Sequence, residues 1–211
     1  MKAVFAAIAL LAITPLAEAQ TVPAPVSSAD VTGTLGWLSG DKGELNSDRY
    51  GNDWYNRSVY GGAGFGWYWT DHWKTDIEAG ISSSAELNIY TSAVIDRRPT
   101  TVNSTYEFAT RRVALGQHYQ FFRNAWFHPF AGAGLDLTWE QIDQTDDVFA
   151  PQPVVGRVRH PRRTEFDARP FTTVGFKAYV SPRTFFRTDL KVVCDKGVDE
   201  TLVRFGLGVD F

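Results

Sequence analysis

Charged side chains occur at alternate positions within several otherwise apolar stretches of the sequence, and their types and spacing could support chemistry. Acids and bases are nearly balanced among them, which favours ion pairing in an enclosed space. We expect Arg112 to pair with Glu78. We expect Lys191, Arg204 and Asp136 to share a second network. We expect all the charged and histidine residues at these alternate positions to face the interior of the fold. They are Asp76, Glu78, Glu86, Arg112, His118, Asp136, Glu140, Lys177, Arg187, Asp189, Lys191, Arg204 and Asp210.

Arginines gather at a second place in the sequence, at Arg157, Arg159, Arg162 and Arg163, with His160 among them. The guanidinium fork matches the geometry of phosphate oxygens, so phosphate binding is one interpretation of this cluster. A solvated, charged loop is the other interpretation, because runs of charge are commonly only solvated. The sequence leaves both open.

Histidine and cysteine spacing predicts neither a catalytic centre nor a metal site. The histidines are His72, His118, His128 and His160, and none lies in the His-x-Ser pattern of the lipid A deacylases. A serine hydrolase needs a nucleophile, a base and an orienting acid within hydrogen-bond reach. The single Cys194 offers no paired thiolate and no internal disulfide. We therefore expect no enzyme activity, no cofactor and no bound metal.

Strict alternation of side-chain character indicates that strands position these charges. In the last segment Phe205 and Leu207 fall on one face, while Arg204 and Gly206 fall on the other, which a helix would scramble. Each alternating segment is long enough for a tilted membrane strand of about 9 to 11 residues. The eight segments are 30–39, 58–69, 73–87, 106–121, 126–140, 168–180, 184–194 and 200–211.

The connections between these segments alternate between short and long. The short ones are 70–72, 123–125 and 181–183, whose Asp, Asn and Pro residues suit tight turns. The longer ones are expected at 40–57, 88–105 and 141–167, with a briefer one at 195–198. Short inner turns and longer outer loops are typical of outer-membrane barrels.

The first residues predict an export signal. A charged start at Lys2, an apolar run and the sequence Ala17-Glu18-Ala19 match a cleaved signal peptide at 1–19, so the mature chain should begin near Gln20. Residues 20–28 would be a flexible periplasmic leader, and 29–211 the barrel. Without Lys2 and Glu18 the charge is 20 minus 23, or −3, which excludes a nucleic-acid footprint.

The two faces of the segments distinguish a membrane barrel from a soluble sandwich or a lipocalin-like barrel. A soluble barrel turns its large apolar side chains inward. Here the charged face is a poor soluble core, and aromatic residues of the apolar face lie near segment ends, as interfacial belts do. These aromatic residues are Trp37, Trp67, Trp69, Trp73, Tyr119, Phe121, Phe127 and Trp139. The sequence therefore predicts an all-β fold, an eight-stranded antiparallel up-and-down transmembrane β-barrel.

Two stretches carry a resemblance to a known family. The aromatic and Gly-rich segment FHPFAGAGLD (127–136) and the terminal Gly208-Val209-Asp210-Phe211 resemble the small outer-membrane β-barrel superfamily that includes the OmpA transmembrane domain, OmpX and the opacity proteins. The resemblance implies that the outer-membrane assembly machinery recognises the C-terminal aromatic residue. Phe211 would have that role here, with Val209, Leu207 and Phe205 on the same face.

Two function classes remain open. The first is a structural or surface-interaction protein of the bacterial outer membrane, with a lumen filled by paired charges and outer loops that contact a ligand or lipopolysaccharide. We expect such a protein to be a monomer. The second is a small-solute porin or narrow gated channel, because polar interiors also line channels.

Overall fold

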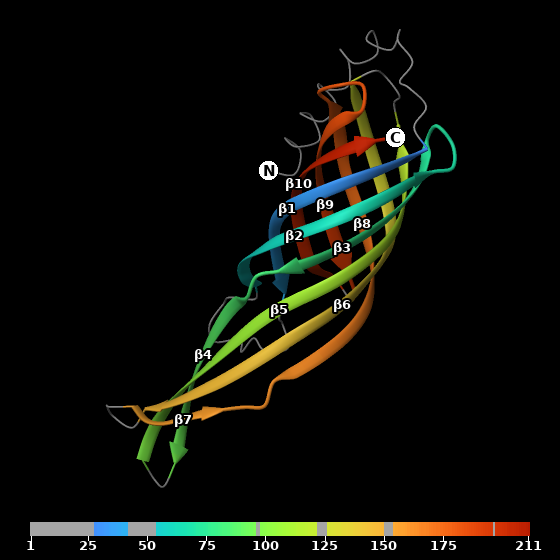
Figure 1. Cartoon of the computed structure of the whole chain (residues 1–211). Coiled ribbons are helices and arrows are strands. Elements are labelled where there is room, and N and C mark those ends of the chain that lie inside the picture. The colour runs from blue at the N-terminus through green and yellow to red at the C-terminus, as the bar shows by residue number, and fades with distance from the viewer. Residues whose placement is uncertain (1–27, 42–53, 96–97, 122–125, 150–153, 196) are drawn as a thin grey trace, which may run out of the picture.

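The computed structural model describes residues 28–41, 54–95, 98–121, 126–149, 154–195 and 197–211. Eight antiparallel strands form a closed ring, in which β1 pairs with β2 on one side and with β10 on the other (Figure 1). The ring strands are β1 (Ala29–Asp41), β2 (Trp54–Tyr68), β3 (Trp73–Ser82), β5 (Arg98–Gln120), β6 (Phe127–Phe149), β8 (Arg163–Tyr179), β9 (Thr184–Cys194) and β10 (Val198–Asp210). The eight-stranded antiparallel barrel predicted from alternation is confirmed.

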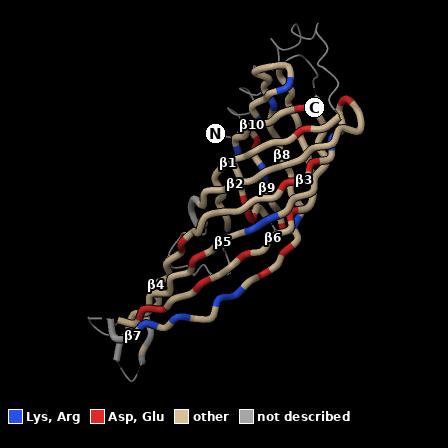
Figure 2. The backbone as a smooth tube through the Cα atoms, viewed as in Figure 1, with Lys and Arg blue, Asp and Glu red and all other residues tan. Residues whose placement is uncertain are grey.

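The alternation of side chains sorts each ring strand into an inner and an outer face. On β10, Arg204 and Asp210 are buried inside the ring, whereas Leu207 is 65% exposed on the outside. A strand places successive side chains on opposite faces, so one sequence can line a polar lumen and an apolar exterior together. Figure 2 shows acidic and basic positions distributed along the strands of the ring.

The same sheet continues beyond one end of the barrel. The hairpin of β4 (Ala85–Ile95) with residues 98–108 of β5 lies beside residues 142–149 of β6, to which β7 (Val154–Arg159) pairs. We call these four strands the extension sheet. Figure 1 shows it projecting away from the end of the barrel where the C-terminus lies.

The extension sheet corrects the expectation of long loops at 88–105 and 141–167. Those residues are largely strands, because β5 and β6 each run for 23 residues and so rise well beyond the length that crosses a bilayer. Their upper halves are rich in Thr, Ser, Asn and Asp, as in NSTYE (103–107), so they lack the apolar alternation that identified the other strands.

The short connections 70–72 and 181–183 lie where expected, between β2 and β3 and between β8 and β9. The strand break at 195–197 also agrees with expectation. Four expected features lie outside the described residues. They are the signal peptide (1–19), most of the leader (20–28), the centre of the 40–57 connection and the short connection 123–125. Within the described residues, no helix is long and apolar enough to cross a membrane.

Candidate functional site in the lumen and on the extension sheet

Buried charges form three groups of ion pairs that cross the lumen. The first group lies at the end of the barrel where the C-terminus of the chain lies. Asp30 on β1 accepts bonds from Lys74 of β3 at 2.9 Å and from Lys177 of β8 at 2.5 Å. The Tyr68 hydroxyl donates to the same carboxylate at 2.8 Å. Asp210 lies 3.6 Å from Lys177. The Asp30 carboxylate of β1 therefore links β3 to β8 across the lumen.

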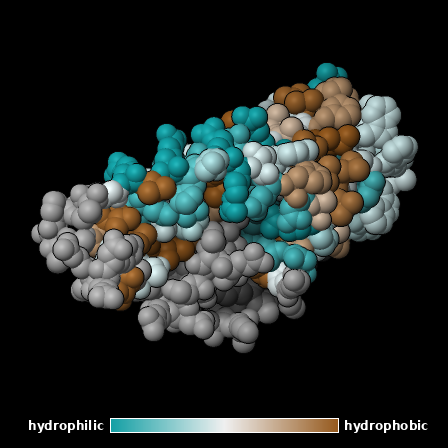
Figure 3. Space-filling model, turned by 90° about the horizontal axis from the view of Figure 1, so that it is seen from below, coloured by the Kyte–Doolittle hydropathy of each residue, from teal (hydrophilic) through white to brown (hydrophobic). Residues whose placement is uncertain are grey.

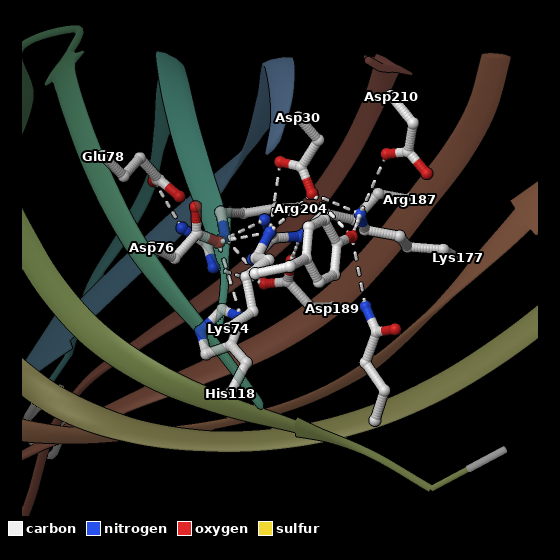
Figure 4. A network of polar contacts seen from close by, with 12 residues as sticks. Asp30, Lys74, Asp76, Glu78, His118, Lys177, Arg187, Asp189, Arg204 and Asp210 are labelled. Carbon is white, nitrogen blue, oxygen red and sulfur yellow. Dashed lines mark hydrogen bonds and ion pairs between the residues drawn. The ribbon is translucent and has the colours of Figure 1, made fainter. Parts of the chain in front are cut away.

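The second group occupies the middle of the barrel and alternates acids with bases (Figure 4). Arg187 contacts Asp76 at 2.8 Å and Asp189 at 2.7 Å. Arg204 contacts Asp189 at 2.6 Å and also pairs with Glu78. All five side chains are buried. Charges removed from water in this way must be paired, because an uncompensated buried ion is very costly.

The third group lies toward the extension sheet. Arg112 contacts Asp136 at 3.2 Å and Glu200 at 2.6 Å. Asp136 has a second cation, Lys191, at 2.5 Å, and Glu200 has a second cation, Arg169, at 2.7 Å. Each carboxylate here is shared by two bases.

The structure corrects the expected pairing of Arg112 with Glu78. The two residues do lie on adjacent strands, but Gly80 is the residue opposite Arg112 in the β3–β5 register. The Tyr60 ring fills the space above Gly80, where a Cβ would overlap its hydroxyl, and this hydroxyl donates to Glu78 at 2.5 Å. Glu78 therefore pairs with Arg204, and Arg112 pairs with carboxylates on β6 and β10.

The second expected network is found in part. Lys191 and Asp136 pair, whereas Arg204 belongs to the central group with Glu78 and Asp189. The lumen residues expected from the sequence omitted Asp30, Lys74 and Glu200, although Asp30 and Lys74 lie at alternate positions between uncharged neighbours. That spacing was the available signal.

Glu86 was expected in the lumen and is instead exposed on the extension sheet, where it accepts a bond from Asn88 at 2.8 Å. The cause is a register change between β3 and β4. Ile81 lies opposite Arg111, but Ala85 lies opposite Phe108, so one extra residue is inserted between the two pairs. A one-residue shift moves every later side chain to the other face of the sheet.

Among the described residues, the central group of the lumen surrounds a small cavity. A cavity of about 10 Å³ lies in the central group, lined by Asp76, Glu78, Ala114, Gly116, His118, Phe171, Arg187, Lys191 and Arg204. That volume holds about one water molecule. His118 forms part of its wall, with Nδ1 3.4 Å from Asp76 and its ring stacked on Phe130.

The other histidines have local contacts. His72 Nδ1 lies 2.8 Å from the carbonyl oxygen of Gln120 at the turn end of the barrel, and His160 Nε2 lies 2.7 Å from Asp146 on the extension sheet. In the part of the chain that the structure describes, no group of three or more His, Cys, Asp or Glu residues could hold a metal ion.

The arginine cluster expected to contact phosphate lies on β7 and at the bend that leads into β8. Arg157 donates two bonds to Asp147, at 2.6 and 3.0 Å, and Arg162 is forked onto Asp143. The hydrogen bond from Arg157 lowers the pKa of Asp147. Two of these four guanidinium groups are thus occupied by carboxylates of β6.

The remaining members of the cluster are more open. Arg163 is exposed and lies 3.7 Å from Glu165, a long contact, and Arg159 is exposed on β7 opposite Thr145. These two arginines retain donors that another phosphate or carboxylate could use.

The C-terminal residues expected to signal assembly are on the exterior. Phe205, Leu207, Val209 and Phe211 are all exposed large apolar side chains. The backbone of Phe211 also completes the ring, because its N–H donates to Ala29 and its carbonyl oxygen accepts from Ser28 and Ala29.

Aromatic pairs mark two levels of the exterior. Trp73 packs on Tyr119 at 5.2 Å between ring centroids near the turn end, and Trp139 packs on Phe166 at 5.2 Å near the extension sheet. Between these levels the exterior is apolar. Figure 3 shows hydrophobic residues on the barrel, hydrophilic residues beside them toward the extension, and further hydrophobic residues at the extension end. Aromatic girdles around an apolar band are the surface of a membrane barrel.

Known structures resemble this chain in fold. Neisserial surface protein A matches with 12% identity and a TM-score of 0.56, over 87% of this chain and 97% of its own. The N-terminal β-barrel domain of Pseudomonas aeruginosa OprF matches with 14% identity and a TM-score of 0.48, over 88% and 98%. No curated protein matches the chain. A family profile described as outer membrane protein beta-barrel domain matches residues 3–211, and the chain therefore belongs to that family of outer-membrane barrels.

Proposed function

We propose that this outer-membrane barrel is a closed anchor that displays the extension sheet at the cell surface, rather than a path for solutes. The observation that carries the proposal is the lumen, where three groups of ion pairs leave a cavity of about 10 Å³. An eight-stranded barrel is just wide enough to be filled by its own side chains. A porin role is the competing proposal.

The ion pairs support a closed lumen because they join strands on different sides of the ring. Arg204 of β10 pairs with Glu78 of β3, and Lys177 of β8 pairs with Asp30 of β1. A solute could pass only if several such pairs separated together. Breaking a single buried pair costs about 3 to 5 kcal/mol, so concerted opening would be rare.

The extension sheet supports the display role. It places four strands beyond the apolar band, with polar residues on the side that continues the barrel exterior, including Asn88, Thr105 and Asp147. We propose that this surface meets a ligand or the sugar and phosphate groups of lipopolysaccharide. Arg159, opposite Thr145, is the available donor on this side, and Arg163, opposite Ile142, is the available donor on the other side. Arg157 and Arg162 would serve chiefly to brace β7 and the bend against β6.

Planar-bilayer conductance of the purified, folded protein tests the closed lumen. The wild type should show no steady openings at moderate voltage. Lys191→Met in the lumen and Arg159→Ala on the extension sheet form a matched pair, since each removes one cation. Steady wild-type openings that change in Lys191→Met and not in Arg159→Ala would refute the closed anchor and establish a channel.

We also propose that residues 1–19 are removed during export, that the assembly machinery recognises the strand ending in Phe211, and that the barrel is monomeric. Sequencing the N-terminus of protein isolated from outer membranes tests the first point, and it should give Gln20. Mass measurement of the detergent-solubilised protein tests the last.

A further inference from the structure

One charged residue breaks the apolar exterior of the barrel. Arg111 on β5 faces outward and is exposed, opposite Ile81 of β3 and Trp139 of β6. Below it on the same face of β5 lie Val113 and Leu115. In the described residues of β3, β5 and β6, no other charged side chain faces outward between the turn-end aromatic residues and the Arg111 level.

The height of Arg111 places it at the edge of the apolar band. It lies eight residues beyond Tyr119, whose ring belongs to the aromatic level at the turn end. At about 3.4 Å per residue and a strand tilt of about 40°, this separation is about 21 Å along the membrane normal. The apolar band of such barrels is about 25 Å tall. The guanidinium group can therefore extend into the headgroup layer, as arginine side chains do at interfaces.

Its neighbours change from apolar to polar at the same level. Trp139 and Phe166 pair across β6 and β8, and directly above them Gln141 pairs with Thr164. In the described part of the chain, no carboxylate lies within ion-pair distance of Arg111, whereas Arg162, farther up the same face, is held by Asp143. Arg111 is thus a cation at a lipid interface with its donors unused.

We propose that Arg111, with Gln141 and Thr164 above it, binds a phosphate group of the lipopolysaccharide that forms the outer leaflet. The level belongs to the outer leaflet because it lies at the end from which the long strands and the extension sheet project. The guanidinium fork of arginine donates to two phosphate oxygens, and hydroxyl and amide groups can donate to a third. The planar ring of Trp139 lies beside the site, at the depth where lipid sugars meet acyl chains.

This inference concerns the barrel exterior and goes beyond the proposed closed anchor, so the two can fail separately. Conductance tests the lumen, and lipid selectivity tests Arg111. A channel could retain the phosphate site, and a closed anchor could lack it.

The test uses the folded protein in phosphatidylcholine nanodiscs, with purified bisphosphorylated lipid A added as the probe and bound lipid counted by native mass spectrometry. Arg111→Gln should bind lipid A about tenfold more weakly, as expected for loss of a hydrogen-bonded charge. Arg183→Gln is the matched control, because Arg183 is an exposed arginine in a turn at the opposite end. It should bind as the wild type does. Gel mobility without heating verifies that each variant is folded.

Further measurements distinguish binding of the lipid A phosphate from binding of other phosphate groups. Arg111→Lys should retain part of the affinity, because a point charge replaces the fork. Dephosphorylated lipid A should bind wild type and Arg111→Gln equally. The proposal is overturned if Arg111→Gln binds bisphosphorylated lipid A as tightly as the wild type. It is also overturned if phosphatidylglycerol or inorganic phosphate at the same concentration competes as well as lipid A does.

Discussion

Arg112 is the side chain whose removal should most clearly expose the energetics of the lumen. It is 2% exposed and bridges Asp136 of β6 and Glu200 of β10, at 3.2 and 2.6 Å. Arg112→Met keeps much of the volume and deletes the charge. Loss of one partner from a buried pair costs about 3 to 5 kcal/mol.

The structure places the expected cost at the lower end of this range, near 3 kcal/mol. Neither carboxylate is left alone, since Asp136 keeps Lys191 at 2.5 Å and Glu200 keeps Arg169 at 2.7 Å. Arg162→Met is the matched control, because its pair with Asp143 is exposed. Exposed pairs contribute about 0 to 1 kcal/mol.

Urea titrations of the protein in phospholipid vesicles, followed by tryptophan fluorescence, give the free energy of unfolding of each variant. A double variant with Glu200→Gln should lose less stability than the sum of the two single losses, since the first change already removes much of the interaction. Equal losses for Arg112→Met and Arg162→Met, or strict additivity in the double variant, would refute the network.

Other expectations follow from the exterior and the extension sheet. Deleting Phe211 should lower the folded amount in outer-membrane fractions while export across the inner membrane continues; normal folded levels would contradict the assembly role. Leu207→Arg should cost about 2 to 4 kcal/mol if it lies near the membrane midplane, against about 0 to 1 for Val180→Arg at a strand end; equal costs would contradict the membrane placement. The lowered pKa of Asp147 means that its bond with Arg157 stabilises the extension fully above 3.8 and is lost as pH falls through the lowered value; carboxyl NMR should show Arg157→Gln raising this pKa toward 3.8. An unchanged pKa would show that the bond is absent in solution. The unheated protein should migrate differently from boiled protein on an SDS gel, because a closed ring has no edge from which to unfold; identical mobility would contradict a closed barrel.

The sequence was sufficient for the barrel because each ring strand alternates between two chemically different faces. On β10, arginine and glycine alternate with valine, phenylalanine and leucine, and only an inside and an outside explain that pattern. The upper halves of β5 and β6 carry polar side chains at successive positions, as in residues 103–107. They therefore lack the alternation of a strand with one apolar face and resemble loops.

Which charged residues pair with each other inside the lumen was harder to predict than which residues face the lumen. Arg112 has carboxylates within reach on both adjacent strands, at Glu78 and Asp136, and the bulk of Tyr60 over Gly80 decides between them. The prediction that Glu86 faces the lumen was wrong for a different reason. A single residue inserted before Ala85 moves the later side chains to the other face of the sheet. A periodic sequence pattern shows neither the side-chain bulk that decides which residues pair across the lumen nor the position of a local β-bulge.

The seam between β1 and β10 has a consequence for how the chain reaches its final state. It joins Asp30 to Asp210, and the bonds from Ser28 and Ala29 to Phe211 complete it. Contacts between residues so distant in sequence make closure slow. During that delay Lys177 cannot meet Asp30, nor Arg204 meet Glu78, across the finished ring. Before closure these ions must therefore stay hydrated, and dehydration of the interior coincides with the pairing of β1 with β10.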